Sequence, residues 1–96
     1  MRVRWTTPAL RDLDIIGDHI ERENSAAVAA RIVTAILDHA DNLAAFPHVG
    51  RAGRIPDTRE LVVVDTPFIV PYRVRDDALE ILAVFHSARQ WPETFD

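Results

Sequence analysis

Arginine is the residue type in this sequence that could bind phosphate or stabilise developing negative charge. All eleven basic residues of the 96 are arginine, and the chain contains no lysine. A guanidinium keeps its charge because its pKa stays above about 12, so it can hold an oxyanion but cannot transfer a proton. Five of these side chains could converge from a loop, the strands and the C-terminal tail: Arg51, Arg54, Arg59, Arg73 and Arg89. The simpler interpretation is surface ion pairing with nearby carboxylates, namely Asp57, Asp65, Asp76 and Asp77.

Cleavage of RNA by a ribose 2′-hydroxyl would need more than cations. The reaction requires a base for the hydroxyl, positive charge for the phosphorane and an acid for the leaving oxygen. His86 is the side chain near the arginines that could move a proton, with Glu60 and Glu80 as weaker candidates. A histidine at a strand end beside apolar residues is more often a structural hydrogen-bonding group, and that is the interpretation we favour for His86.

The sequence predicts neither a metal site nor a cofactor. It has no cysteine, and its four histidines occur without HxH or HxxxH spacing. The segment Gly50-Arg51-Ala52-Gly53 does not fit a glycine-rich phosphate loop. Trp91 is better explained as an anchor for the tail than as a platform on which a base stacks.

Net charge and hydropathy restrict the class of protein further. The formal net charge is −4, whereas proteins that bind nucleic acid tightly on their own are usually basic. No uninterrupted apolar run exceeds five residues, so we expect no membrane span and no secretory signal. A cytoplasmic location fits the lack of cysteine.

Hydrophobic periodicity predicts the elements that position these residues. A short strand at Met1–Trp5 is followed by two helices joined by two or three residues, which predicts an antiparallel helical hairpin. The first helix runs from Thr7-Pro8 to about Glu23, and the second opens at Asn24-Ser25 and ends near Ala45. A long loop and three strands follow, at His48–Thr58, Glu60–Asp65, Phe68–Val74 and Leu79–Phe85, before an irregular tail at 87–96.

The expected fold class is therefore α+β, a single two-layer domain over 1–96 with the order strand, helix, helix and a three-stranded antiparallel meander. Alternation in the last strand predicts inward-facing Leu79, Ile81, Ala83 and Phe85. The reverse sheet face would then be open and would carry Arg73, Leu82, Val84 and His86. We expect a bulge or an edge position at Pro71, because proline removes a ladder donor.

Several segments, in their order and spacing, resemble the RelE/ParE toxin superfamily. They are Phe46-Pro47-His48-Val49-Gly50-Arg51, Arg59-Glu60-Leu61, Pro67-Phe68-Ile69-Val70-Pro71-Tyr72-Arg73-Val74, and the stretch from Glu80 to Pro92. The two-helix front half is similar as well. The resemblance implies the toxin of a bacterial type II toxin–antitoxin module, held inactive by a cognate antitoxin that also makes the DNA contacts of the complex.

The superfamily divides by target, and we favour the ParE-like branch, whose members bind DNA gyrase. RelE-like members cut mRNA on the ribosome with lysines, arginines and a tyrosine or histidine, whereas this chain has no lysine and no tyrosine in its tail. The candidate target-binding residues are Arg51, Arg54, Arg59, Arg89 and Trp91. If the chain were RelE-like, the catalytic set would be His86, Arg73, Arg89, Arg51, Arg54 and Arg59.

The expected antitoxin-binding residues lie on the sheet face predicted to be open, and they are Ile69, Arg73, Leu82 and Val84. We expect a flexible antitoxin segment to fold there, as a helix in a groove beside the helical hairpin, as a strand on the sheet edge, or as both. A protein-interaction module without toxicity is the third interpretation of the same sequence.

Overall fold

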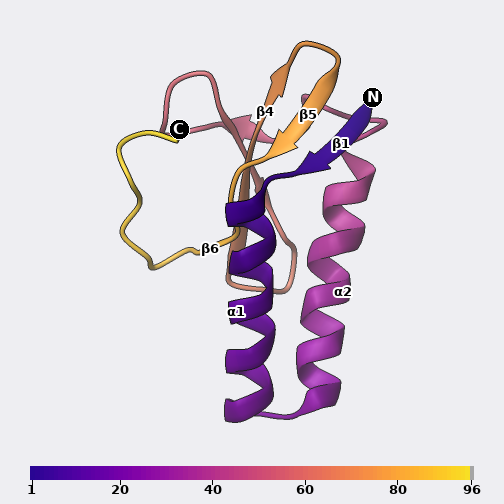
Figure 1. The fold of residues 1–96 in the computed structure, drawn as a ribbon, viewed down its shortest axis with the longest axis vertical. Coiled ribbons are helices and arrows are strands. Elements are labelled where there is room, and N and C mark those ends of the chain that lie inside the picture. The colour runs from indigo at the N-terminus through magenta and orange to yellow at the C-terminus, as the bar shows by residue number, and fades with distance from the viewer. Residues whose placement is uncertain (96) are drawn as a thin grey trace.

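A helical hairpin covers one face of a twisted sheet in the computed structural model, which describes residues 1–95 (Figure 1). The helices are α1 (Thr7–Glu23) and α2 (Ala26–Asn42). The strands are β1 (Arg2–Trp5), β2 (Arg51–Ala52), β3 (Arg59–Val62), β4 (Phe68–Arg75), β5 (Ala78–Ile81) and β6 (Phe85–His86). The predicted α+β class is confirmed, and within residues 1–95 neither helix has the length and apolarity needed to cross a membrane.

The second helix begins where its capping residue predicted, whereas the first begins one residue earlier, because Thr6 and not the predicted Thr7 is its N-cap. The hydroxyl of Thr6 accepts a hydrogen bond from the N–H of Ala9, and the hydroxyl of Ser25 accepts one from Val28. The α1 stripe begins with Ala9 and Leu13, which are buried against the sheet. α2 ends at Asn42, three residues before the predicted Ala45, because the chain turns more tightly there: Leu43, Ala44 and Ala45 each donate to the carbonyl oxygen three residues earlier.

The sheet contains more strands than the predicted meander, and it is mixed. Its order is β1-β5-β4-β3-β2, with β6 pairing β4 beyond the end of β5. β1 pairs with β5 in parallel, and the intervening helical hairpin provides the crossover that a parallel pair requires. β2 forms within the long loop and pairs with β3 through Arg51↔Glu60 and Ala52↔Arg59.

The predicted last strand is interrupted, and the interruption changes which residues face the helices. Tyr72 pairs with Ile81, but Ile69 pairs with Phe85, so the β5–β6 segment holds one residue more than the stretch of β4 opposite it. This bulge lies across from Pro71, whose carbonyl accepts the N–H of Leu82. The irregularity predicted at Pro71 is therefore found on the neighbouring strand.

The bulge shifts the alternation by one residue, so part of the predicted facing is wrong. Val84 is in the core beneath the helices and is 2% exposed. Phe85 shares the reverse face with Ile69, and His86 shares the helix-side face with Phe68. Sequence alternation alone placed each of these three residues on the opposite face.

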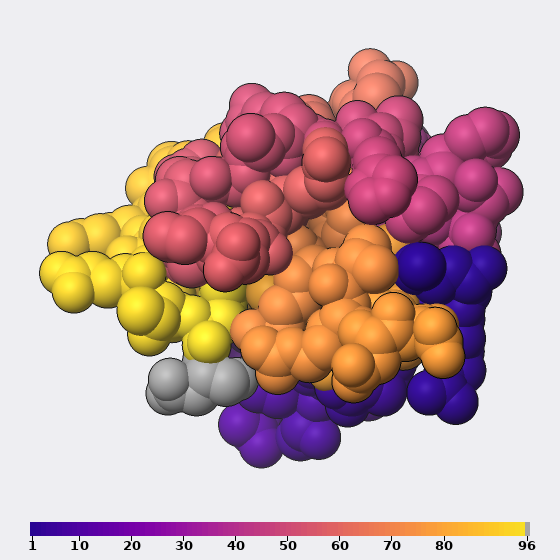
Figure 2. Space-filling view, turned by 90° about the horizontal axis from the view of Figure 1, so that it is seen from above, coloured from indigo at the N-terminus to yellow at the C-terminus, as the bar shows by residue number. Residues whose placement is uncertain are grey.

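The part of the reverse face around Ile69, Leu82 and Phe85 is not the open surface that the sequence predicted. Ile69 and Leu82 are each 5% exposed, and Val84 points the other way. The tail returns along this side of the molecule, and Trp91 and Phe95 pack on Phe85. In the space-filling view the tail (yellow) lies against the loop between α2 and β3 (Figure 2).

Candidate functional site

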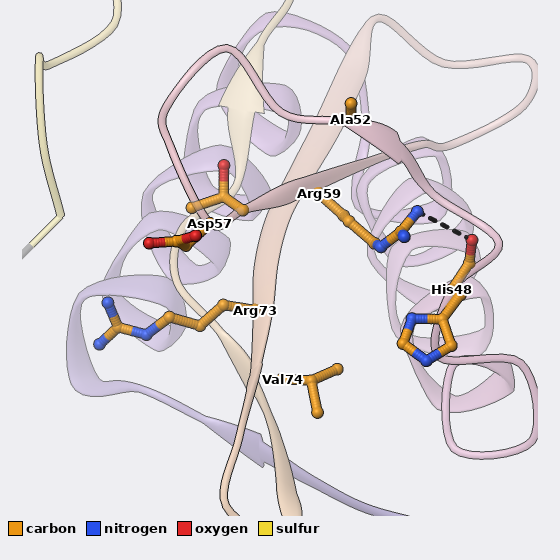
Figure 3. A pocket seen from close by; sticks show the side chains of 7 residues that line it. His48, Ala52, Asp57, Arg59, Arg73 and Val74 are labelled. Carbon is orange, nitrogen blue, oxygen red and sulfur yellow. Dashed lines mark hydrogen bonds between the residues drawn. The ribbon is translucent and has the colours of Figure 1, made fainter.

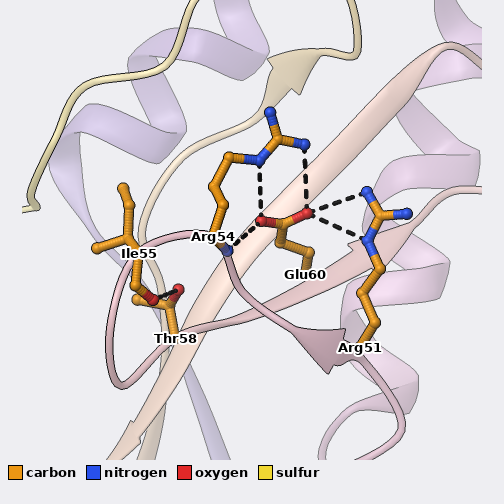
Figure 4. A network of polar contacts seen from close by, with 5 residues as sticks. All are labelled: Arg51, Arg54, Ile55, Thr58 and Glu60. Atoms are coloured by element: carbon orange, nitrogen blue, oxygen red, sulfur yellow. Dashed lines mark hydrogen bonds and ion pairs between the residues drawn. The ribbon is translucent and has the colours of Figure 1, made fainter.

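Glu60 is a buried carboxylate shared by two arginines of the long loop. Its Oε1 accepts hydrogen bonds from Nε and Nη2 of Arg51 at 3.2 and 3.0 Å. Its Oε2 accepts from the backbone N–H of Arg54 at 2.8 Å and from Nε of Arg54 at 3.2 Å. Figure 4 shows the carboxylate lying between the two guanidinium groups. The Glu60 side chain is 2% exposed, whereas those of Arg51 and Arg54 are 54% and 46% exposed.

The balance of burial and hydrogen bonding keeps Glu60 ionised. Burial by itself would raise the pKa of this carboxyl. The hydrogen bonds from the backbone and side chain of Arg54 and from Arg51 outweigh burial and hold the pKa of Glu60 below its ordinary value. Glu60 is therefore a fixed anion that orients two half-exposed guanidinium groups, and its low pKa makes it a poor proton donor.

The tail completes the arrangement by stacking on one of these arginines. The guanidinium carbon of Arg54 lies 3.7 Å from the ring centroid of Trp91, and Trp91 meets Phe85 edge-on at 5.0 Å. The guanidinium carbon of Arg89 lies over the ring of Phe85, 4.3 Å from its centroid. We call this group the loop–tail cluster, defined as Arg51, Arg54, Glu60, Phe85, Arg89 and Trp91.

Arg59 points away from the loop–tail cluster and holds the loop from its other side. It donates to the carbonyl oxygens of His48 at 3.1 Å and Gly50 at 2.8 Å. Gly50 in turn donates its N–H to the hydroxyl of Tyr72 at 2.9 Å, and a Cβ at position 50 would lie only 2.6 Å from that oxygen. Burial raises the pKa of Tyr72, so its hydroxyl is a neutral acceptor that fixes the loop to β4.

A second buried glutamate, Glu80, is bound by arginines on both sides. Nε of Arg73 donates to Oε1 of Glu80 at 2.9 Å, and Arg4 pairs with the other oxygen. Arg73 also lines a pocket of about 290 Å³ with Arg59 and His48. Figure 3 shows Arg59 directed toward His48 and Arg73 directed toward the side of Asp57, so the two guanidinium groups diverge.

His86 lies apart from the loop–tail cluster, on the helix side of the sheet. Its ring meets Phe68 edge-on at 5.7 Å, and it lines an apolar groove of about 320 Å³ with His19 and Ile20. Its Nδ1 accepts the N–H of Ala88 at 3.1 Å. The structure therefore brings together Arg51, Arg54, Arg89 and Trp91 on one face, and it places His86 on the other.

Two features of the site were not predicted from the sequence. The arginines pair with Glu60 and Glu80, not with the predicted Asp57, Asp65, Asp76 and Asp77, among the ion pairs of residues 1–95. Arg4 was not a candidate, because 76 positions separate it from Glu80 along the chain and only the parallel pairing of β1 with β5 joins them. The sequence did carry one signal for these ion pairs. Glu60 and Glu80 are charged residues in strands whose neighbouring positions are mostly apolar.

Comparison with known proteins identifies one matching family and two relatives that are named as toxins. Residues 3–91 match the family described as the ParE toxin of the type II toxin–antitoxin system parDE. Y4kP of Sinorhizobium fredii (strain NBRC 101917 / NGR234), provisionally named a toxin, is 52% identical over 92 residues, which are 96% of this chain and 94% of that protein. Toxin RelE2 of Caulobacter vibrioides (strain ATCC 19089 / CIP 103742 / CB 15) is 39% identical over 88 residues, covering 92% and 97% of the two chains.

A solved structure is similar over nearly the whole fold. It is described as the chromosomal ParDE TA system from P. aeruginosa, and it superimposes with a TM-score of 0.83 at 31% sequence identity. The match covers 90% of this chain and 95% of that one.

Proposed function

The chain belongs to the ParE toxin family of type II toxin–antitoxin systems, and from that premise we propose that it arrests growth in the cytoplasm by binding DNA gyrase. A cognate antitoxin neutralises it. The function as a toxin follows from the family, whereas the target and the residues that contact it are the proposal.

The observation that carries the choice of target is the separation of His86 from the arginines. Cleavage of RNA needs a proton-transfer group and a cation at the same phosphate. His86 lies beside Phe68 on the helix side, and Arg54 and Arg89 lie with the tail on the reverse side. Glu60 and Glu80 are each bound by arginines on both sides, and the hydrogen bonds to Glu60 hold its pKa below the ordinary value. This arrangement favours recognition of a partner over proton transfer.

The loop–tail cluster has the composition of a protein-binding hot spot. Arginine and tryptophan are enriched among the residues that dominate binding energy, especially where their orientation is fixed beforehand. Glu60 fixes Arg51 and Arg54, and Trp91 is held between Arg54 and Phe85. We therefore retain Arg51, Arg54, Arg89 and Trp91 as target contacts and assign Arg59 to holding the loop.

The antitoxin contact is better placed in the apolar groove than on the sheet face first expected. Ile69, Leu82 and Val84 are buried by this chain itself, and of the predicted set Arg73 keeps partial exposure. The groove between α1 and the ends of β4 and β6 is lined by the half-buried Ile20 and the buried Phe68, and Ile15 beside it is 59% exposed. An amphipathic helix of the antitoxin could bury this surface.

Expression in bacterial cells tests the proposed target. We expect filamentous cells with damaged DNA while bulk translation initially continues, and restored growth when the neighbouring antitoxin gene is co-expressed. Codon-spaced cleavage of ribosome-bound mRNA would instead support the RelE-like alternative, which the 39% identity to Toxin RelE2 keeps in view. Normal growth of cells that contain folded protein would favour an interaction module without toxicity.

A further inference from the structure

Four arginines occupy the reverse face of the sheet at the end away from the tail. The register places Arg2 and Arg75 on either side of Ala78, and Arg4 and Arg73 on either side of Glu80. We call Arg2, Arg4, Arg73 and Arg75 the arginine quartet. Neighbouring strands lie about 4.8 Å apart, so the two arginines of a row have Cα atoms roughly 10 Å apart, and the two rows are roughly 7 Å apart. Figure 2 looks down on this end, with the β4–β5 hairpin (orange) beside the N-terminal strand (indigo).

The two rows of the quartet differ in the residue between the arginines. In one row, Glu80 supplies a carboxylate that both Arg4 and Arg73 bind. In the other row the central residue is Ala78, whose methyl group offers no charge. Within residues 1–95, neither Arg2 nor Arg75 forms an ion pair, the turn carboxylates of Asp76 and Asp77 included. The second row therefore has two flanking arginines like the first, but it has no carboxylate between them.

The surrounding charge makes this face attractive to anions. Register and ring contacts place seven arginines on the reverse face, against the two glutamates that pair with them: Arg2, Arg4, Arg51, Arg54, Arg73, Arg75 and Arg89. The two helices carry seven acidic residues and three arginines, so they are negative. The chain is thus strongly polarised, although its net charge is −4. Burial, then the charges of Arg75 and Arg4, lower the pKa of Arg73, as crowding of positive charge requires.

We propose that the arginine quartet binds the phosphates of a nucleic-acid backbone, with one phosphate lying over Ala78 between Arg2 and Arg75. Guanidinium groups suit phosphate because they donate two parallel hydrogen bonds to its oxygens. The choice of duplex DNA rests on the proposed function, because gyrase holds DNA while it works. The anion site itself rests on the strand register, the ion pairs and the charge of this face, and not on the proposed function.

The composition of this surface favours nucleic acid over an acidic protein. The six reverse-face positions of β1, β5 and the end of β4 are four arginines, Glu80 and Ala78. Protein–protein interfaces have an apolar, often aromatic core, whereas interfaces with DNA are polar and positively charged. Because the site offers few cations, we expect weak binding that adds to the protein contacts of the toxin with gyrase.

Salt-dependent binding of labelled oligonucleotides to the full chain tests the site. The probes are a duplex DNA of about 20 base pairs, a single-stranded RNA of equal length and a glutamate-rich peptide, each measured from low to physiological salt by fluorescence anisotropy. The test variant is Arg2→Ala/Arg75→Ala. The control is Arg22→Ala/Arg31→Ala, which removes the same charge from exposed positions of the acidic helices.

We expect the duplex to bind at low salt and the test variant to weaken it by roughly tenfold, because the one phosphate neutralised between Arg2 and Arg75 contributes about −0.9 to the slope of log K against log salt. The control should change affinity by less than about twofold at the same salt. Ala78→Glu, which places a carboxylate between Arg2 and Arg75 as Glu80 lies between Arg4 and Arg73, should also abolish the phosphate contact. Melting temperatures of all variants establish that they are folded.

Three results would overturn the proposal. They are no duplex binding at low salt, equal losses in the test and control variants, or tighter binding of the RNA or the peptide than of the duplex. A separate supercoiling assay distinguishes this failure from failure of the proposed function. Gyrase inhibition without DNA binding would leave the proposed target standing and remove the phosphate site. DNA binding without gyrase inhibition would leave the phosphate site standing and remove gyrase as the proposed target.

Discussion

Replacement of Glu60 by glutamine should loosen the loop that carries two candidate target contacts. The carboxylate accepts four hydrogen bonds of 3.2 Å or less from Arg51 and Arg54. Glutamine keeps one carbonyl oxygen, but its amide N–H₂ would face a donor of one arginine. The change therefore removes the shared negative charge and leaves one buried donor without an acceptor.

The size of the effect follows from how exposed the partners are. A buried N–H that loses its acceptor costs about 1–3 kcal/mol, whereas a half-exposed guanidinium is rehydrated and each lost pair costs at most about 1 kcal/mol. We therefore expect Glu60→Gln to lower the free energy of unfolding by about 2 kcal/mol at pH 7, a fall in Tm of roughly 8–16 °C for a domain of this size. Glu93→Gln, at an exposed tail position, is the matched control and should leave Tm nearly unchanged.

The pH dependence gives the same experiment a second readout. The pKa of Glu60 is lower in the folded chain than its ordinary value of 4.5, so its contribution is present above that value and is lost as pH falls through the folded pKa. Wild type and Glu60→Gln should therefore converge in stability as the pH drops below about 4.5. Equal Tm values at pH 7, or a difference that persists unchanged in acid, would refute the claim that Glu60 organises the loop.

Three further substitutions test separate contacts. Trp91→Ala should lower stability by about 1–2 kcal/mol through loss of the ring and guanidinium stacking, and trypsin should then cleave after Arg89 faster than in wild type or Trp91→Phe. Tyr72→Phe should cost about 1–3 kcal/mol in urea unfolding, because the buried N–H of Gly50 loses its acceptor. His86→Gln should leave growth arrest nearly intact if no proton moves, and complete loss of toxicity in a stably folded variant would contradict the binding mechanism.

Local signals predicted the helices well. A cap at Ser25 and a regular apolar stripe are properties of neighbouring residues, so they can be read directly from the sequence, although α1 is capped by Thr6 and not by the predicted Thr7. The strands were found for the same reason, apart from the two-residue β2, which is too short to show a period. The parallel partner of β1 depends on a long-range crossover that carries no local signal.

The bulge opposite Pro71 explains the wrong facing that was predicted for the residues after it. Strand alternation has a period of two, so a single extra residue reverses the facing of every residue after it. Val84, Phe85 and His86 all follow the bulge, and each lies on the face opposite to the prediction. The structure brings Arg51, Arg54, Arg89 and Trp91 together, but the aspartates predicted as ion-pair partners were wrong, because the sheet register decides which carboxylate an arginine meets.

The most direct measurement of the central claim is DNA supercoiling by purified gyrase in the presence of the purified chain. The loop–tail cluster predicts concentration-dependent inhibition that the cognate antitoxin relieves, that His86→Gln retains, and that Arg54→Ala and Trp91→Ala weaken in variants that still fold. Undiminished supercoiling at a concentration of toxin that arrests growth in cells would contradict gyrase as the target, and cleavage of ribosome-bound mRNA by the same preparation would identify the ribosome in its place.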